Sequence, residues 1–272
     1  MSLRDRIATP DGKRRFVRAI FATIADRYDF ITVVLSYGQD QRWKRRLVDL
    51  AAPRPSARAL DLATGTGDIA FALASRGARV IGLDITFRMI ELARGKVAPG
   101  KFDVARGFTP GDRGPKRAAP HSKRAAPHSE KAAPQQTPRF LVGDMGALPF
   151  PAGSFDIVTT GYGLRNVPTL ATAIDEIGRV LAPGGQLLSL DFNRPSNRIV
   201  RSAYLAYLTV VGAALGWMLH RDADTYRYIP ASIRQYPGAE AVARSLESRG
   251  FTGVRWYPVL GGLMTIHHAT RT

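Results

Sequence analysis

The sequence of 272 residues contains no cysteine, and this absence excludes disulfides, cysteine-ligated metal centres and thiol catalysis. Its N-terminus has no apolar run of the secretory type, so we expect a cytoplasmic location. Acidic residues are scarce: 22 Asp and Glu stand against 39 Lys and Arg, which leaves a formal net charge of +17. This charge favours nucleic acid, anionic membrane surfaces or anionic small molecules as partners, and it carries no information about fold.

Long hydrophobic runs are also missing. The longest apolar stretch without a charge, residues 203–219, is slightly shorter than the roughly 20 residues that a membrane-spanning helix needs. We predict a buried or lid helix there, within an apolar substrate region over 196–235. The alternative is a surface that admits an apolar substrate or dips into a membrane. The composition, 45% hydrophobic and 22% charged, is otherwise typical of a soluble globular protein.

One segment, residues 101–139, is rich in Pro, Gly, Ala and basic residues. It contains the repeat KRAAPHS at 116–122 and 123–129, followed by a degraded copy at 130–136. Each copy has a Pro and no large apolar residue, so the segment cannot bury enough surface to offset its ordering entropy. We therefore predict a disordered basic insertion in a surface loop. A nucleic-acid or membrane tether is the less favoured interpretation.

The rest of the chain alternates between short apolar runs and segments with helical spacing. This alternation predicts one domain over 1–272 with an open, mostly parallel α/β sheet. The predicted strands lie at 57–62, 78–84, 139–143, 154–160 and 186–191, with a closing pair at 251–258 and 263–270. The predicted helices lie at 14–26, 40–51, 68–75, 86–94, 170–181 and 239–249.

The most informative motif is a glycine loop where the first predicted strand turns into a helix. Gly65, Thr66 and Gly67 are small enough for a ligand to approach the backbone closely at the carboxyl end of the strand. Asp61 before the loop and Asp68 after it would repel a pyrophosphate. They suit a ligand with an ammonium or sulfonium group.

Two further acids follow the next strands. Asp84 ends the second strand, where a carboxylate accepts hydrogen bonds from ribose hydroxyls. Asp144 follows the third strand and can accept from the exocyclic amine of adenine, while Met145 packs on the ring. Asp often caps helices, so each acid alone is a weak signal. Together they predict an adenosyl ligand with a cationic centre, which is S-adenosylmethionine.

The sequence resembles the class I methyltransferases and, more specifically, the ubiquinone/menaquinone biosynthesis C-methyltransferase family. The resemblance covers nearly the whole chain except 101–139. The most family-specific motifs are the Gly-Leu-Arg-Asn-Val stretch at 163–167 and the Tyr-x-Tyr…Ser-Ile stretch at 226–233. It implies a Rossmann-like, mostly parallel seven-stranded sheet with helices on both faces and a helical N-terminal cap over 1–52. The other motifs that match the family lie at 28–29, 35–38, 43–44, 61–68, 143–150 and 181–185.

The resemblance also implies a reaction: S-adenosylmethionine-dependent C-methylation of a reduced polyprenyl quinone. Demethylmenaquinol is favoured over the benzoquinol of ubiquinone synthesis, and no metal is expected. We expect peripheral contact with an anionic membrane, aided by arginines such as Arg198. We do not expect a nucleic-acid partner, and the oligomeric state stays open. The implied cofactor-site residues are Thr66, Asp84, Asp144, Met145 and Gly161. The implied catalytic residues are Arg165 and Asn166, and the weaker substrate-side candidates are Tyr226, Tyr228 and Ser232.

Two positions depart from the family pattern. Thr32 stands where the family usually has Asn, and Asp40 where it often has His, so substrate contacts in the cap are where we expect a difference. Three rival functions remain open. They are a methyltransferase for another small phenol or amine, an RNA methyltransferase, and a non-catalytic basic membrane or nucleic-acid binding protein on this scaffold. The Asn/Asp-Pro-Pro-aromatic turn expected of the second is absent from the sequence.

Overall fold

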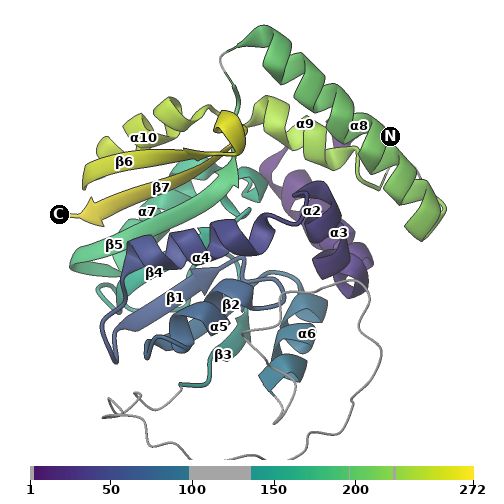
Figure 1. Cartoon of the computed structure of the whole chain (residues 1–272). Helices are drawn as coiled ribbons and strands as arrows, with labels where there is room; N and C mark the ends of the chain where they lie inside the picture. Colours follow the sequence, from purple (N-terminus) through teal and green to yellow (C-terminus); the bar gives the residue numbers. More distant parts are fainter. Residues whose placement is uncertain (1–2, 98–135, 196, 223–224) are drawn as a thin grey trace, which may run out of the picture.

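The computed structural model describes residues 3–97, 136–195, 197–222 and 225–272 (Figure 1). Within them, seven strands form one sheet with the order β3-β2-β1-β4-β5-β7-β6. Strands β1 to β5 are parallel, and β7 runs antiparallel to both β5 and β6. The predicted, mostly parallel seven-stranded sheet is therefore confirmed. The strands are β1 (Arg58–Leu62), β2 (Arg79–Asp84), β3 (Arg139–Val142), β4 (Phe155–Gly161), β5 (Leu181–Phe192), β6 (Phe251–Val259) and β7 (Met264–Arg271).

Helices cover both faces of the sheet because neighbouring strand residues point to opposite sides. On one face, Leu47 and Leu73 belong to an apolar cluster with Ala59 of β1. On the other face, Ile174 packs in a second cluster with Leu60, the next residue of β1. The first cluster draws on α4 (Asp40–Ala51), α5 (Asp68–Ala74) and α6 (Phe87–Val97), and the second on α7 (Leu170–Val180) and α10 (Ala239–Glu247).

Strand β5 is longer than its predicted range, 186–191. It begins at Leu181, and its pairing with β4 jumps from Phe155–Leu181 to Ile157–Gln186. Residues 182–185 therefore form an irregularity inside the strand. The Pro-Gly-Gly sequence correctly marks the end of α7, but the backbone resumes pairing across it, with Gly184 in the left-handed region at a φ of 74°.

The N-terminal cap is built from α1 (Leu3–Arg6), α2 (Pro10–Ile24), the short 3-10 helix η1 (Ala25–Arg27) and α3 (Tyr28–Leu35). Thr9 begins α2 by accepting a hydrogen bond from the Gly12 backbone N–H, at 3.1 Å. The sequence predicted one helix over 14–26 and none over 28–35. The fourth helix of the predicted cap range, α4, packs its apolar side into the cluster on the sheet.

The apolar stretch forms α8 (Arg198–His220), which lies over α3 and α9 (Tyr228–Gln235) at the outer side of the cap (Figure 1). Among the described residues, only α8 is long and apolar enough to cross a membrane, with 28% of its most apolar window buried. Its buried side includes Tyr204, Leu208 and Leu215. Of the predicted disordered insertion over 101–139, residues 101–135 lie outside the described residues, 136–138 have no regular secondary structure, and Arg139 already begins β3.

Candidate active site

The glycine loop lies at the carboxyl end of β1 and is fixed from below by Asp61. The Asp61 carboxylate accepts hydrogen bonds from the hydroxyls of Thr64, at 2.6 Å, and Thr159, at 2.8 Å. Burial raises the pKa of Asp61 to about 6, against the opposing effect of these hydrogen bonds. The loop itself needs left-handed backbone at Gly65, with a φ of 55°, and Gly67, with a φ of 92°. Asp61 thus supports the loop from behind and lines neither of the two spaces beside the loop.

Asp84 joins this loop to the end of β2. Its Oδ2 accepts from the Gly65 backbone N–H at 3.0 Å, and its Oδ1 accepts from the Thr86 N–H at 2.8 Å. Burial raises the pKa of Asp84, while these two backbone donors oppose the rise. Each carboxylate oxygen keeps a second lone pair for a ligand in the adjoining cavity.

This first cavity, which we call the cofactor cavity, holds about 680 Å³ of space between the strand ends and the cap. Asp84, Asp144, Met145, Gly65 and Gly161 all line it, so the structure brings these five predicted residues together. Apolar walls flank a carboxylate that can accept from vicinal hydroxyls, and an adenosyl group requires this combination of an apolar surface and an acceptor. The cap closes the cavity with Arg14, Val17 and Phe21 from α2 and Tyr28 from α3.

Arg14 is a residue that the sequence did not single out. Its Nε lies 2.7 Å from Asp144 Oδ2, and Asp144 Oδ1 accepts from the Gly146 N–H at 2.8 Å. The first of these contacts ties the cap to the end of β3. No local pattern signals it, because α2 and β3 are far apart in sequence.

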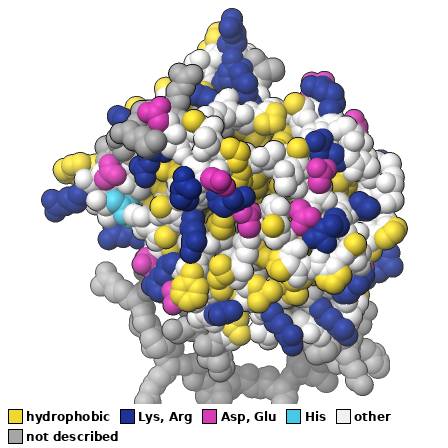
Figure 2. All heavy atoms as spheres, turned by 180° about the vertical axis from the view of Figure 1, so that it is seen from behind, with side chains coloured by type: hydrophobic (Ala, Val, Ile, Leu, Met, Phe, Trp, Pro, Cys, Tyr) yellow, Lys and Arg dark blue, Asp and Glu magenta, His cyan; other side chains and the backbone are white. Residues whose placement is uncertain are grey.

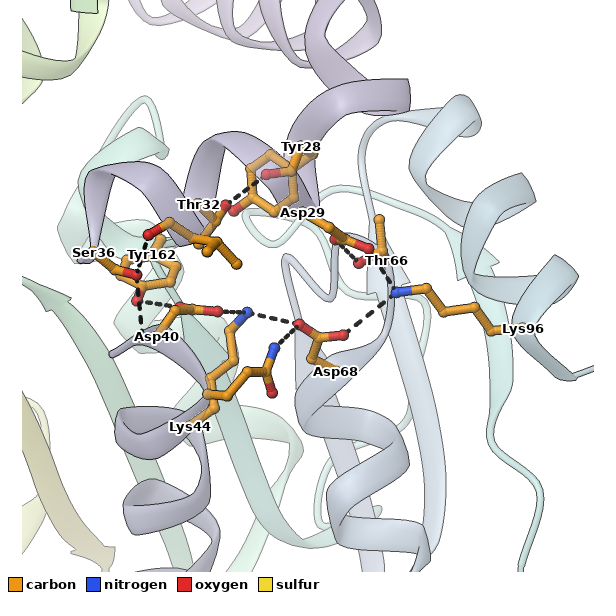
Figure 3. Close-up of polar contacts among 12 residues, drawn as sticks. Tyr28, Asp29, Thr32, Ser36, Asp40, Lys44, Thr66, Asp68, Lys96 and Tyr162 are labelled. Atoms are coloured by element: carbon orange, nitrogen blue, oxygen red, sulfur yellow. Dashed lines mark hydrogen bonds and ion pairs between the residues drawn. The ribbon is translucent and has the colours of Figure 1, made fainter. Parts of the chain in front are cut away.

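A chain of charges, buried at Asp40 and Lys44 and half-exposed at Asp29, borders the other end of the cofactor cavity (Figure 3). Lys44 Nζ lies 2.6 Å from Asp40 Oδ2 and 2.9 Å from Asp68 Oδ2. Lys96 then bridges Asp68, at 3.4 Å, and Asp29, at 3.0 Å. Burial alone would raise the pKa of Asp68, but Lys44 and Lys96 outweigh it and hold that pKa well below its usual range.

Thr66 also joins this chain, because its hydroxyl donates to Asp29 Oδ1 at 2.6 Å. Lys44, Thr66 and Asp68 line a small extension of the cavity beside the glycine loop. Opposite charges side by side suit the zwitterionic amino-acid end of S-adenosylmethionine. Gly67 shapes the loop but does not line this space.

A second cavity, the acceptor cavity, lies between the cap, α8 and α9 and holds about 730 Å³. It shares the rings of Phe21, Tyr28 and Tyr162 with the cofactor cavity, so the two spaces meet at these side chains. Its walls are mainly aliphatic and aromatic, and Arg165 is its one cationic lining residue. Such a space fits a flat ring attached to an apolar tail.

Arg165 lies in the 3-10 helix η2 (Leu164–Asn166) and is only 6% exposed. Its Nη1 donates to Ser232 Oγ at 2.7 Å, and its Nε lies 3.2 Å from Asp191 Oδ1. The guanidinium carbon is 4.7 Å from the centre of the Phe192 ring. Ser232 therefore orients Arg165 and lines neither cavity. Sequence reasoning missed Asp191, although it follows the same rule as the other acids at strand ends.

The remaining predicted residues divide between the two cavities. Asn166 lines the cofactor cavity, and its Nδ2 donates to the Tyr162 carbonyl at 2.8 Å. Tyr226 and Tyr228 line the acceptor cavity. The Tyr226 hydroxyl lies 3.0 Å from His220 Nε2. The buried Tyr228 hydroxyl has no hydrogen-bond partner among the described residues.

Comparison with known proteins places these cavities in context. The chain matches the model of the ubiE/COQ5 methyltransferase family over residues 9–106 and 123–271. It is 37% identical over 254 residues to the demethylmenaquinone methyltransferase of Thermus thermophilus, covering 93% of this chain and all of that protein. It is 32% identical to the ubiquinone/menaquinone biosynthesis C-methyltransferase of Teredinibacter turnerae, covering 95% and 92% of the two chains.

Solved structures share the fold at lower identity. A possible histamine N-methyltransferase from Thermotoga maritima aligns with a TM-score of 0.60 and 16% identity, covering 94% of this chain and all of that one. The magnesium protoporphyrin IX methyltransferase of Synechocystis, solved with bound S-adenosylmethionine, aligns with a TM-score of 0.57 and 18% identity, covering 96% and 97%. Both likenesses concern the fold alone.

Proposed function

The chain belongs to the ubiE/COQ5 methyltransferase family, and we propose that it methylates a ring carbon of a reduced polyprenyl quinone. Demethylmenaquinol is the favoured acceptor, because the Thermus relative carries that activity in its name at 37% identity. The observation that carries the proposal is the apolar acceptor cavity with one buried arginine, joined to the cofactor cavity through shared aromatic rings.

The cofactor of this reaction is S-adenosylmethionine, and the residues of the cofactor cavity fit it. Asp84 would accept from the ribose hydroxyls, Met145 would contact the adenine, and Lys44 and Thr66 would border the amino-acid end. When bound, the cofactor supplies an electrophilic methyl group on a positively charged sulfur. The protein then has to hold the acceptor carbon in line and make that carbon nucleophilic.

Arg165 supplies the electrostatic part of this task. A quinol ring carbon becomes nucleophilic when the neighbouring hydroxyl loses its proton, and the buried guanidinium stabilises the resulting negative charge. An arginine with a pKa above 12 is a poor base, so it acts as a fixed positive charge. Its contacts with Ser232 and Asp191 hold it in place before the acceptor enters.

The outer face of α8 supports a finer proposal, peripheral contact with an anionic membrane at its cytoplasmic side. Ile199, Val210, Trp217 and Met218 on this helix are 80%, 70%, 67% and 59% exposed. On the face shown in Figure 2, Lys and Arg side chains spread over the surface with fewer Asp and Glu among them. Basic residues near an anionic surface contribute about 1 kcal/mol each.

The membrane contact is tested by sedimentation with vesicles that contain an anionic phospholipid, at low salt. We expect the wild-type chain to sediment with them and Trp217→Ser to bind several-fold more weakly. Trp256→Ser is the matched control, because Trp256 is exposed on β6, outside α8. Equal binding by both variants, or no binding by the wild type, would contradict the proposal.

The reaction is tested with purified protein, S-adenosylmethionine and a reduced demethylated naphthoquinol that carries a short prenyl tail. We expect one methyl group to be added to the reduced acceptor, scored by product mass, and none to the oxidised quinone, which has no hydroxyl proton to lose. The benzoquinol analogue in parallel tests the preference between rings. Equal transfer to the oxidised form would contradict the proposed activation.

A further inference from the structure

Tyr162 occupies an unusual position at the junction of the two cavities. It directly follows β4, lies between Gly161 and Gly163, and adopts left-handed backbone with a φ of 61°. A side chain seldom adopts this conformation, and such residues gather at functional sites. Tyr162 lines the cofactor cavity, its extension beside the glycine loop, and the acceptor cavity.

The hydroxyl of Tyr162 is held by Asp40. It donates to Asp40 Oδ1 at 2.5 Å, while the other carboxylate oxygen of Asp40 faces Lys44 Nζ at 2.6 Å (Figure 3). Asp40 is 2% exposed, and its backbone N–H donates to the Ser36 hydroxyl at 3.1 Å. Because the phenol proton points to Asp40, a lone pair on the phenol oxygen remains for another donor.

Several other groups near the acceptor cavity, Tyr226 with its His220 partner excepted, cannot take a proton in the same way. Arg165 keeps its charge. Asp191 accepts from the backbone N–H groups of Arg165 and Phe192, pairs with the guanidinium, and lines neither cavity. Asp84 lines the cofactor cavity but not the acceptor cavity. The Tyr228 hydroxyl has no carboxylate partner among the described residues to receive its proton.

We propose that Tyr162 and Asp40 form the proton acceptor for the hydroxyl of the acceptor ring. In this step, the O–H bond of the quinol breaks and its proton passes to Tyr162 Oη. The proton of Tyr162 passes at the same time to Asp40 Oδ1, and the electron pair stays on the quinol oxygen, beside Arg165. After methylation, the ring carbon loses its hydrogen as a proton to solvent, and the proton held by Asp40 returns through Tyr162 to the quinol oxygen, so that one proton is released overall.

Charges from several elements surround this pair and set its pH dependence. Lys44 places a positive charge 2.6 Å from Asp40 Oδ2. Burial and the charge of Asp40 raise the pKa of Tyr162 well above its usual value, so Tyr162 remains a neutral relay at neutral pH. Tyr28 and Asp191 also act on Tyr162, and Asp68 acts on Lys44. Asp84 and Arg165 lie one step further out, where they act on Tyr28.

The relay rests on the proposed function, and Tyr162→Phe tests it because the ring stays and only the hydroxyl is lost. We expect kcat for the quinol to fall roughly 100-fold or more, the usual contribution of a positioned base, with little change in KM. The remaining activity should rise with pH in proportion to hydroxide, because the acceptor must then ionise without help. S-adenosylmethionine affinity, measured by calorimetry, should stay within about twofold of wild type.

Two further variants serve as a second test and as a control. Asp40→Asn can still accept from Tyr162 but cannot take its proton, so it should lose activity as Tyr162→Phe does. Tyr236→Phe removes another buried phenol that lines neither cavity, and it should keep the wild-type pH profile. A Tyr162→Phe enzyme with wild-type kcat and pH profile would overturn the relay alone. Absence of quinol methylation by the wild-type chain would overturn the proposed function and the relay with it.

Discussion

Replacing Lys44 with Met tests the buried charge chain at the site. The Lys44 side chain is 9% exposed and lies between Asp40 and Asp68, whose side chains are 2% and 18% exposed. The substitution leaves two carboxylates without their shared cation. Breaking a buried pair in this way costs about 3 to 5 kcal/mol of unfolding free energy. For a chain of this size, this corresponds to a fall in Tm of about 6 to 10 °C.

The assay is urea unfolding followed by circular dichroism, with Arg58→Met as the matched control. Arg58 pairs with Asp156 at 2.7 Å, but both side chains are about half exposed, so this loss should stay under about 1 kcal/mol. Combining Lys44→Met with Asp68→Asn should recover part of the lost stability. A Lys44→Met variant that loses no more stability than Arg58→Met would refute the argument.

The pH dependence gives this prediction a second check. Because the folded pKa of Asp68 lies below its ordinary value of 3.8, its stabilising contribution is present above that value and is lost as the pH falls. Removing Lys44 takes away one of the charges that hold the folded pKa of Asp68 down, so that pKa rises. The stability gap between wild type and variant should therefore be full at neutral pH and shrink toward acid pH. A gap independent of pH would contradict the assignment of this cost to Asp68.

Three further predictions concern the cofactor loop and the insertion. Asp84→Asn should weaken S-adenosylmethionine binding roughly 10- to 100-fold by calorimetry, the loss expected for charged hydrogen bonds; unchanged affinity would contradict the ribose contact. The folded pKa of Asp61 is raised to about 6 from 3.8, so the charged form of Asp61 costs stability above pH 6. The free energy of unfolding should therefore rise as the pH falls from 6 toward 4, and Asp61→Asn should lack that rise. Deleting residues 107–122, outside the family match, should change kcat/KM less than about twofold, and a larger loss would assign the insertion a catalytic role.

Much of the cofactor cavity could be predicted because it follows from local order along the chain. Asp84 and Asp144 stand at the ends of successive strands, and the ends of parallel strands meet at one edge of the sheet. Applied to the fifth strand, the same rule would have identified Asp191. The position of Asp61 behind the loop was not predictable in this way, since it depends on the hydroxyls of Thr64 and Thr159.

The cap could be predicted only as helical. Arg14 and Tyr28 reach the cofactor cavity through packing between segments far apart in the chain, which no periodicity in the sequence encodes. Asp40 stood out in the sequence only as a departure from the family pattern. Its partner Lys44, one turn along the predicted helix over 40–51, follows from helical spacing. Its partner Tyr162, after β4, becomes visible only once α4 lies on the sheet.

The most direct test of the account is transfer from S-adenosylmethionine with a deuterated methyl group to the reduced demethylated naphthoquinol, with the product examined by mass spectrometry and proton NMR. We predict a product heavier by one labelled methyl group, with the loss of one aromatic ring proton and both hydroxyl groups intact. A label on oxygen, or no transfer while the cofactor still binds, would contradict carbon methylation of a quinol by this enzyme.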